Sequence, residues 1–142
     1  MNTAWAATAG AVTFVWLGMV LAISFLETPL KFRAPGVTVP IGLGIGRLVF
    51  RALNSVEAVL AAVVLAAVLA GGAPAGVLGP AAAVVALLAV QVGVVRRRLG
   101  RRSDRVLAGE ELPRSRGHLA YVAFEVAKAV LLVVLGVALL AV

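Results

Sequence analysis

The chain has 142 residues, of which 63% are hydrophobic and 13% are charged, and its mean hydropathy is +1.11. A soluble domain usually contains about 45–50% apolar and about 25% charged residues, so this composition predicts a membrane protein. The absence of cysteine excludes disulfides, thiolate catalysis and zinc–cysteine sites.

Four apolar segments are long enough to cross a hydrocarbon layer about 30 Å thick, which requires roughly 20 helical residues. They are Trp5–Leu26, Leu48–Ala70, Val77–Val95 and Leu119–Val142. None shows the alternation of apolar and polar residues that is typical of a membrane β-barrel strand. We therefore predict an all-α, polytopic membrane protein with four transmembrane helices in an antiparallel bundle. The prediction is one domain, residues 1–142, with helices over residues 5–27, 43–70, 77–95 and 118–142.

The first apolar segment has the position of a signal peptide. Residues 1–4 carry no Lys or Arg, however, and the apolar stretch is longer than a usual signal sequence and has no convincing cleavage site. We expect it to be retained as the first helix.

The basic residues are distributed unevenly between the connections. The first connection and its borders hold Lys31, Arg33, Arg47 and Arg51, and the third, a basic loop over residues 96–117, holds Arg96, Arg97, Arg98, Arg101, Arg102, Arg105, Arg114 and Arg116. The second connection, residues 71–76, has none. The positive-inside rule then places the first and third connections in the cytoplasm and both termini outside it. Ala-, Val- and Arg-rich usage suggests a bacterial chain, hence the plasma (inner) membrane.

The arginine-rich third connection also invites a nucleic-acid interpretation. It has no interleaved aromatic residues and no room for a nucleic-acid-binding fold, so we expect no nucleic-acid partner. Contact with anionic lipid head groups, worth about 1 kcal/mol per basic residue, accounts for the charge. Asp104, Glu110, Glu111 and Pro113 in the same loop predict a short amphipathic or irregular segment on the membrane surface.

Polar residues inside transmembrane helices are rare and costly, and each is a candidate functional residue. With the predicted topology, all of them fall in the cytoplasmic half of the membrane: Glu27, Asn54, Glu57, Gln91, Glu125 and Lys128. Helical periodicity places them on polar stripes. The stripes combine Thr13, Trp16, Ser24 and Glu27 on helix one, Arg47, Arg51 and Asn54 on helix two, and His118, Tyr121, Glu125 and Lys128 on helix four.

These stripes predict one polar cavity that is open to the cytoplasmic leaflet. The predicted ligand-binding residues are Glu27, Arg47, Arg51, Asn54, Glu57, Gln91, Tyr121, Glu125 and Lys128. The arginines would attract an anionic head group, the amides would supply hydrogen bonds, and the other charged residues would balance charge or relay protons. The expected function is binding or transport of an amphiphile or small anion, and no catalytic residue or metal site is predicted.

The bundle is also expected as a homo-oligomer. One alternative is that these polar residues are only interhelical salt bridges that fix packing. Another is a structural or accessory subunit of a larger membrane complex, in which the polar residues and the basic loop are docking surfaces. Gly42, Gly44 and Gly46 form G-x-G-x-G, but no strand precedes them, which argues against a nucleotide site. His118 by itself cannot form a metal site.

Two resemblances to known families add to this interpretation. The segments Phe25–Phe32 and Gly46–Phe50 resemble a family of small bacterial four-helix membrane proteins of unknown function. That family is similar to a eukaryotic transmembrane protein associated with platinum-drug tolerance. The basic segment after the third helix and the His118-Leu119 start of the fourth helix also resemble the pattern of that family.

The second resemblance is local. Arg51-Ala52-Leu53-Asn54-Ser55-Val56-Glu57 is similar to the Arg-Ala-x-x-Asn-x-x-Glu signature of the membrane-associated eicosanoid and glutathione metabolism family, with one residue fewer between Arg and Asn. Members of that family are four-helix trimers that bind glutathione between subunits. The resemblance implies a glutathione-dependent enzyme in which Arg51, Asn54 and Glu57 contact the thiol cofactor.

Overall fold

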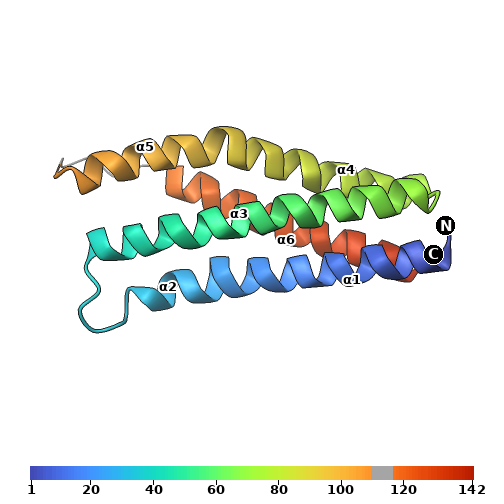
Figure 1. The fold of residues 1–142 in the computed structure, drawn as a ribbon, viewed down its shortest axis with the longest axis horizontal. Coiled ribbons are helices and arrows are strands. Elements are labelled where there is room, and N and C mark those ends of the chain that lie inside the picture. Colours follow the sequence, from blue (N-terminus) through green and yellow to red (C-terminus); the bar gives the residue numbers. More distant parts are fainter. Residues whose placement is uncertain (110–116) are drawn as a thin grey trace.

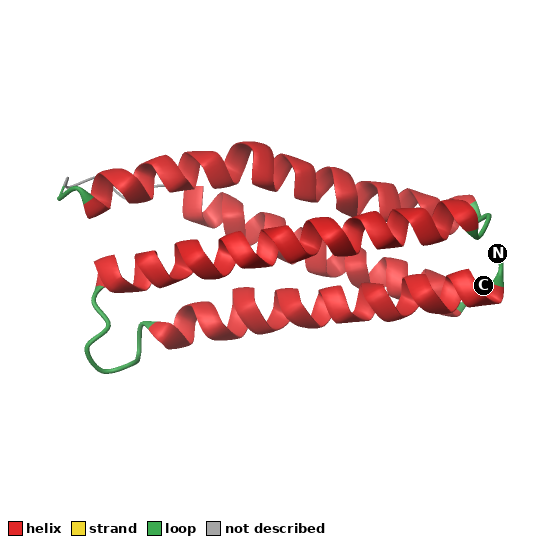
Figure 2. Ribbon diagram, in the orientation of Figure 1, coloured by secondary structure: helices red, strands yellow, loops and turns green. Residues whose placement is uncertain are grey.

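The computed structural model describes residues 1–109 and 117–142, and these form helices without any strand (Figures 1 and 2). Each long helical stretch is sufficiently long and apolar to cross a membrane. The stretches are α1 (Thr3–Val20), η1 (Leu21–Glu27) and α2 (Thr28–Lys31); α3 (Val39–Ala70); α4 (Ala75–Val90), η2 (Gln91–Val95) and α5 (Arg96–Leu107); and α6 (Gly117–Leu140). The expected surface segment around Glu110, Glu111, Pro113, Arg114 and Arg116, and the side chain of His118, lie outside the described part of the chain.

Local sequence signals set the helix starts and the turns. The Asn2 side chain accepts hydrogen bonds from the backbone N–H groups of Ala4 and Trp5 at 3.0 and 3.4 Å and so caps α1. Thr38 caps α3 in the same way, and proline in the first turn is tolerated because its missing N–H has no helical partner there. Gly72, at φ +65°, turns the chain from α3 into α4.

The long helices run in alternating directions, and both termini lie at the same end as the α3–α4 turn (Figure 1). Helix α1 packs against α3 and α6, and α4 packs against the same two helices. Helices α3 and α6 therefore lie diagonally across the molecule. A large apolar core fills the half nearest the termini, and it includes Val64, Val84 and Leu135. A smaller cluster in the opposite half joins Phe50, Leu53 and Tyr121.

The distribution of polarity is inverted relative to that of a soluble domain. Large apolar side chains cover the outside, such as Leu48 at 70%, Leu69 at 68% and Leu119 at 67% exposed. The buried polar side chains are Thr13, Glu57, Gln91, Glu125 and Lys128, each at most 1% exposed. Polar groups are thus withdrawn from the surface that the apolar residues cover.

The four expected helices are present, but three of them extend further than predicted. The first, expected to end at residue 27, continues through α2 to Lys31. The third continues as α5 through Leu107, so residues 96–107 form a helix where a basic loop was expected. Arg and Leu are good helix formers, and no proline lies between Arg96 and Pro113. Helix α3 starts at Val39 instead of residue 43 because the Thr38 cap lies further upstream.

Candidate functional site

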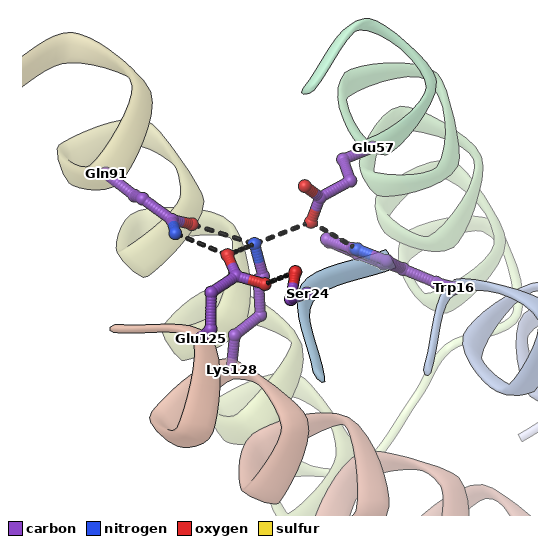
Figure 3. Close-up of polar contacts among 6 residues, drawn as sticks. All are labelled: Trp16, Ser24, Glu57, Gln91, Glu125 and Lys128. Carbon is purple, nitrogen blue, oxygen red and sulfur yellow. Dashed lines mark hydrogen bonds and ion pairs between the residues drawn. The ribbon is translucent and has the colours of Figure 1, made fainter. Parts of the chain in front are cut away.

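The Lys128 ammonium group lies at the centre of a buried polar network (Figure 3). It donates hydrogen bonds to Gln91 Oε1 at 2.7 Å, to Glu125 Oε1 at 2.7 Å and to Glu57 Oε2 at 2.8 Å. An ammonium group has three protons to donate, so its hydrogen-bonding capacity is fully used. This saturation is what allows a lysine to be withdrawn completely from solvent.

Other donors complete the network around the two carboxylates. The Trp16 indole Nε1 donates to Glu57 Oε2 at 2.7 Å, and the Ser24 hydroxyl donates to Glu125 Oε2 at 2.5 Å. The Gln91 amide Nε2 donates to Glu125 Oε1. We call this set the buried ionic cluster; its members are Trp16, Ser24, Glu57, Gln91, Glu125 and Lys128.

The buried ionic cluster connects every long helical stretch. Glu57 on α3 and Lys128 on α6 bridge the diagonal between two helices that have little backbone contact, and Trp16 on α1 joins Glu57 from the side. Ser24 lies in the π-helical segment η1, and Gln91 begins the π-helical segment η2. Such wide turns within α-helices are rare and occur frequently at functional sites.

The charge of the cluster is not balanced when all its groups are ionised. Lys128 contributes one positive charge, whereas Glu57 and Glu125 contribute one negative charge each, and all three are at most 1% exposed. The cluster therefore has one excess negative charge in a place without solvent.

A cavity of about 870 Å³ adjoins the cluster and is lined by η1, α2, α3, η2, α5 and α6. Its walls are largely apolar and include Phe25, Leu43, Phe50, Val92 and Leu99. Basic residues line it as well: Lys31, Arg47, Arg51, Arg96 and Arg102. Ser24 and Glu125 belong both to the cavity wall and to the buried ionic cluster, so the two regions share a boundary.

Contacts between neighbouring side chains hold the basic wall in place. Arg47 pairs with Asp104 of α5, and the Arg96 guanidinium donates to the backbone oxygen of Arg47 at 3.1 Å. The same guanidinium lies 5.4 Å from the centroid of the Phe50 ring, a cation–π distance. Phe50 in turn packs edge-on against Tyr121, with 5.3 Å between ring centroids.

Asn54 lines the same cavity with an unused acceptor. Its Oδ1 is buried and has no hydrogen-bond partner within the described residues. A buried amide oxygen without a partner is costly, so it is available to a donor that enters the cavity.

The structure divides the predicted ligand-binding residues into three groups. Glu57, Gln91, Glu125 and Lys128 were expected to line one cavity with the arginines; they meet instead in the buried ionic cluster, and of these four only Glu125 also lines the cavity. Arg47, Arg51, Asn54, Tyr121 and Glu125 line the cavity.

Glu27 forms the third group, and it stands apart from both the cluster and the cavity. Glu27 Oε2 lies 3.9 Å from Lys31 Nζ, and the Glu27 side chain as a whole is about a third exposed. Helical periodicity placed it on the stripe of Trp16 and Ser24, but the wider turns of η1 change the rotation per residue and move Glu27 off that stripe.

Several residues of the site were missing from the predicted set. Trp16 and Ser24 were placed on the polar stripe of helix one but not among the ligand-binding residues. Arg96 and Arg102 were assigned to a loop, although Arg96, Leu99, Ser103 and Val106 recur at the helical spacing that lines the cavity. That spacing was the signal available in the sequence.

Within residues 1–109 and 117–142, no group of three or more His, Cys, Asp or Glu side chains is arranged to hold a metal ion. No protein-family model, curated protein or solved structure matches this chain. The function must therefore be argued from the geometry of the cavity and of the buried ionic cluster.

Proposed function

We propose that this chain is an integral membrane protein, an antiparallel bundle of four spanning helices, whose cavity binds or transports an amphiphile with an anionic head. The inverted polarity supports membrane insertion, because large apolar side chains face outward while the charged network is sealed inside. In water such a surface would favour aggregation, whereas in a bilayer it contacts lipid tails.

The charge distribution supports the orientation. Basic residues gather at the end of the molecule that carries the α2–α3 connection and α5, and the α3–α4 turn at the opposite end has none. The positive-inside rule then puts the cavity in the cytoplasmic half of the plasma (inner) membrane and both termini on the other side.

The observation that carries the proposal is the combination of basic residues and apolar walls in one cavity. The positive residues Arg47, Arg51 and Arg96 attract an anionic head, and Phe25, Leu43 and Val92 offer apolar surface to a hydrocarbon chain. Its volume of about 870 Å³ falls in the range of roughly 300–1,000 Å³ that is usual for ligand sites. A small inorganic anion would gain nothing from the apolar walls.

The glutathione interpretation receives no comparable support from the geometry. Arg51 and Asn54 line the cavity, but Glu57, the third residue of that motif, is engaged with Trp16 and Lys128 in the interior. The motif residues therefore do not share one surface that a ligand could contact.

Binding of dioctanoyl phosphatidylglycerol to the purified protein in neutral detergent tests the proposal. We expect saturable binding that Arg51→Gln weakens by roughly 10- to 100-fold, because a hydrogen bond to a charged group contributes about 1.5–3 kcal/mol. Arg51 is exposed to the cavity and its side chain is not needed for packing, so the variant should fold. Arg98→Gln, an exposed arginine outside the cavity, should bind as the wild type does.

Three further ligands distinguish the alternatives. The dioctanoyl diacylglycerol, which lacks the anionic head, and glycerol phosphate, which lacks the chains, should each bind more weakly than the intact lipid. Equal binding of glycerol phosphate would indicate that the ligand is a small anion and not an amphiphile. Tighter binding of glutathione would favour the glutathione-dependent enzyme. Absence of binding by all of these ligands would favour a structural or accessory subunit.

A further inference from the structure

The excess negative charge of the buried ionic cluster must be compensated by a positive charge. An uncompensated charge in a medium of low dielectric constant is strongly disfavoured, and such groups take up a proton instead of remaining ionised. Glu57, Glu125 and Lys128 are the charged members, and their two carboxylates share one ammonium at 2.8 and 2.7 Å. A single bound proton makes the cluster neutral.

The hydrogen bonds distinguish the two carboxylates. Glu125 accepts from Lys128, Gln91 and Ser24, so both of its oxygens already have donors. Glu57 accepts from Lys128 and Trp16 only through Oε2. Its other oxygen, Oε1, is buried and has no hydrogen-bond partner within the described residues. Oε1 is therefore the oxygen free to carry the proton.

The neighbours of Glu57 on each packed helix agree with this assignment. Helix α6 contributes Lys128 and, further away, the like charge of Glu125. Helix α1 contributes the neutral Trp16, and η2 contributes the neutral Gln91 to the same cluster. Along α3 itself, Arg51 and Asn54 face the cavity. No second cation among the described residues forms an ion pair with Glu57.

Glu125 links the cluster to the cavity, because it lines the cavity wall and also binds Lys128. An anion that enters the cavity lowers the local electrostatic potential, which favours protonation of the cluster. By thermodynamic linkage, a proton on the cluster must then favour the anion by the same factor.

From this geometry we infer that the buried ionic cluster is a proton-binding site, with its proton on Glu57 Oε1, and that an anionic amphiphile in the cavity strengthens the binding of this proton. The transfer forms one O–H bond on Glu57 with a proton from water and needs no other reactant. The proton site does not depend on the proposed function, whereas its linkage to an anionic amphiphile rests on that function.

Infrared spectroscopy of the ligand-free protein in a lipid bilayer tests the proton site. We expect a carbonyl band of a protonated carboxylic acid that grows as the pH falls, shifts in deuterated water and is absent in Glu57→Gln. This variant keeps the hydrogen bonds of Oε2 with a neutral amide, so it should fold. Glu27→Gln, which removes a carboxylate outside the cluster and the cavity, should retain the band. Identical carbonyl regions for the wild type and Glu57→Gln at every pH would overturn the inference.

Trp16 provides a second measurement, because its indole donates directly to Glu57. The chain has two tryptophans, so Trp5→Phe leaves Trp16 as the only tryptophan. Any pH-dependent change in its emission should follow a one-proton curve and disappear in the Trp5→Phe, Glu57→Gln double variant. A pH-dependent change that persists in the double variant would assign the proton to another group.

The linkage is tested with phosphatidylglycerol, whose phosphodiester keeps its charge over the accessible pH range. Binding by the wild type should take up protons from a weak buffer and should tighten as the pH falls, whereas Glu57→Gln should show neither effect. Binding that is independent of pH would overturn the linkage. An infrared band of Glu57 without any phosphatidylglycerol binding would overturn the proposed function and leave the proton site supported.

Discussion

Replacement of Lys128 by Met should lower the free energy of unfolding by about 3–5 kcal/mol, the usual cost of removing one partner from a buried ion pair. Lys128 is fully buried and donates to three side chains at 2.7–2.8 Å. Without it, Glu57 and Glu125 face each other in the interior without a cation. Both carboxylates would then have to be protonated, or the helices would have to separate and admit water.

Unfolding of the detergent-solubilised protein, followed by circular dichroism against denaturant, measures this effect. Arg47→Met is the matched control, because Arg47 pairs with Asp104 while the two side chains remain 40% and 60% exposed. An ion pair of that kind contributes about 0–1 kcal/mol, so the control should unfold almost as the wild type does. A loss below about 1 kcal/mol for Lys128→Met would contradict the geometry of the buried ionic cluster.

The second large effect is the recovery of stability when all three charges are removed together. Glu57→Gln, Glu125→Gln and Lys128→Met combined should have nearly the stability of the wild type, because no charge is then left buried without a partner. Relative to Lys128→Met alone, the triple variant should gain several kcal/mol. The gain is non-additive because the three side chains contact one another.

Although the triple variant should recover stability, it should lose the function of the cluster. It lacks the group that holds the proton, so phosphatidylglycerol binding should lose its pH dependence while the protein stays folded. That result would indicate that the three charged residues are present to bind a proton and not to stabilise the fold. If the triple variant is as unstable as Lys128→Met, the cluster is a packing device, and the structural interpretation of these residues gains support.

The helices and the depth of the site were predictable because both depend on local sequence. Hydropathy over about 20 residues identifies a spanning helix, and counting from the basic connections places Glu57, Gln91, Glu125 and Lys128 at a common depth. The pairing of Glu125 with Lys128 follows from their spacing of three residues on one helix.

The remaining features depend on tertiary structure. The ion pair between Glu57 and Lys128 crosses the diagonal of the bundle, so it depends on how α3 and α6 are rotated relative to each other. No sequence signal marks the π-helical segments that position Ser24 and Gln91. Helix α5 was not predicted because contact of its arginines with lipid head groups is equally compatible with a loop.

Cysteine accessibility at Ser55 tests the central claim, that an anionic amphiphile enters the cavity from the cytoplasmic side. Ser55 lines the cavity, a Ser→Cys change alters one atom, and the chain has no other cysteine. A membrane-impermeant thiol reagent should modify Ser55→Cys in inverted vesicles but not in intact cells. Dioctanoyl phosphatidylglycerol should slow that modification, and glycerol phosphate should not.

Ala108→Cys is the control, because Ala108 is exposed just beyond the end of α5 and outside the cavity. It should react in inverted vesicles at the same rate with and without lipid. The proposal predicts cytoplasmic labelling of Ser55→Cys that phosphatidylglycerol slows selectively. Labelling of Ser55→Cys only from the extracytoplasmic side, or at a rate that a saturating concentration of phosphatidylglycerol leaves unchanged, would contradict it.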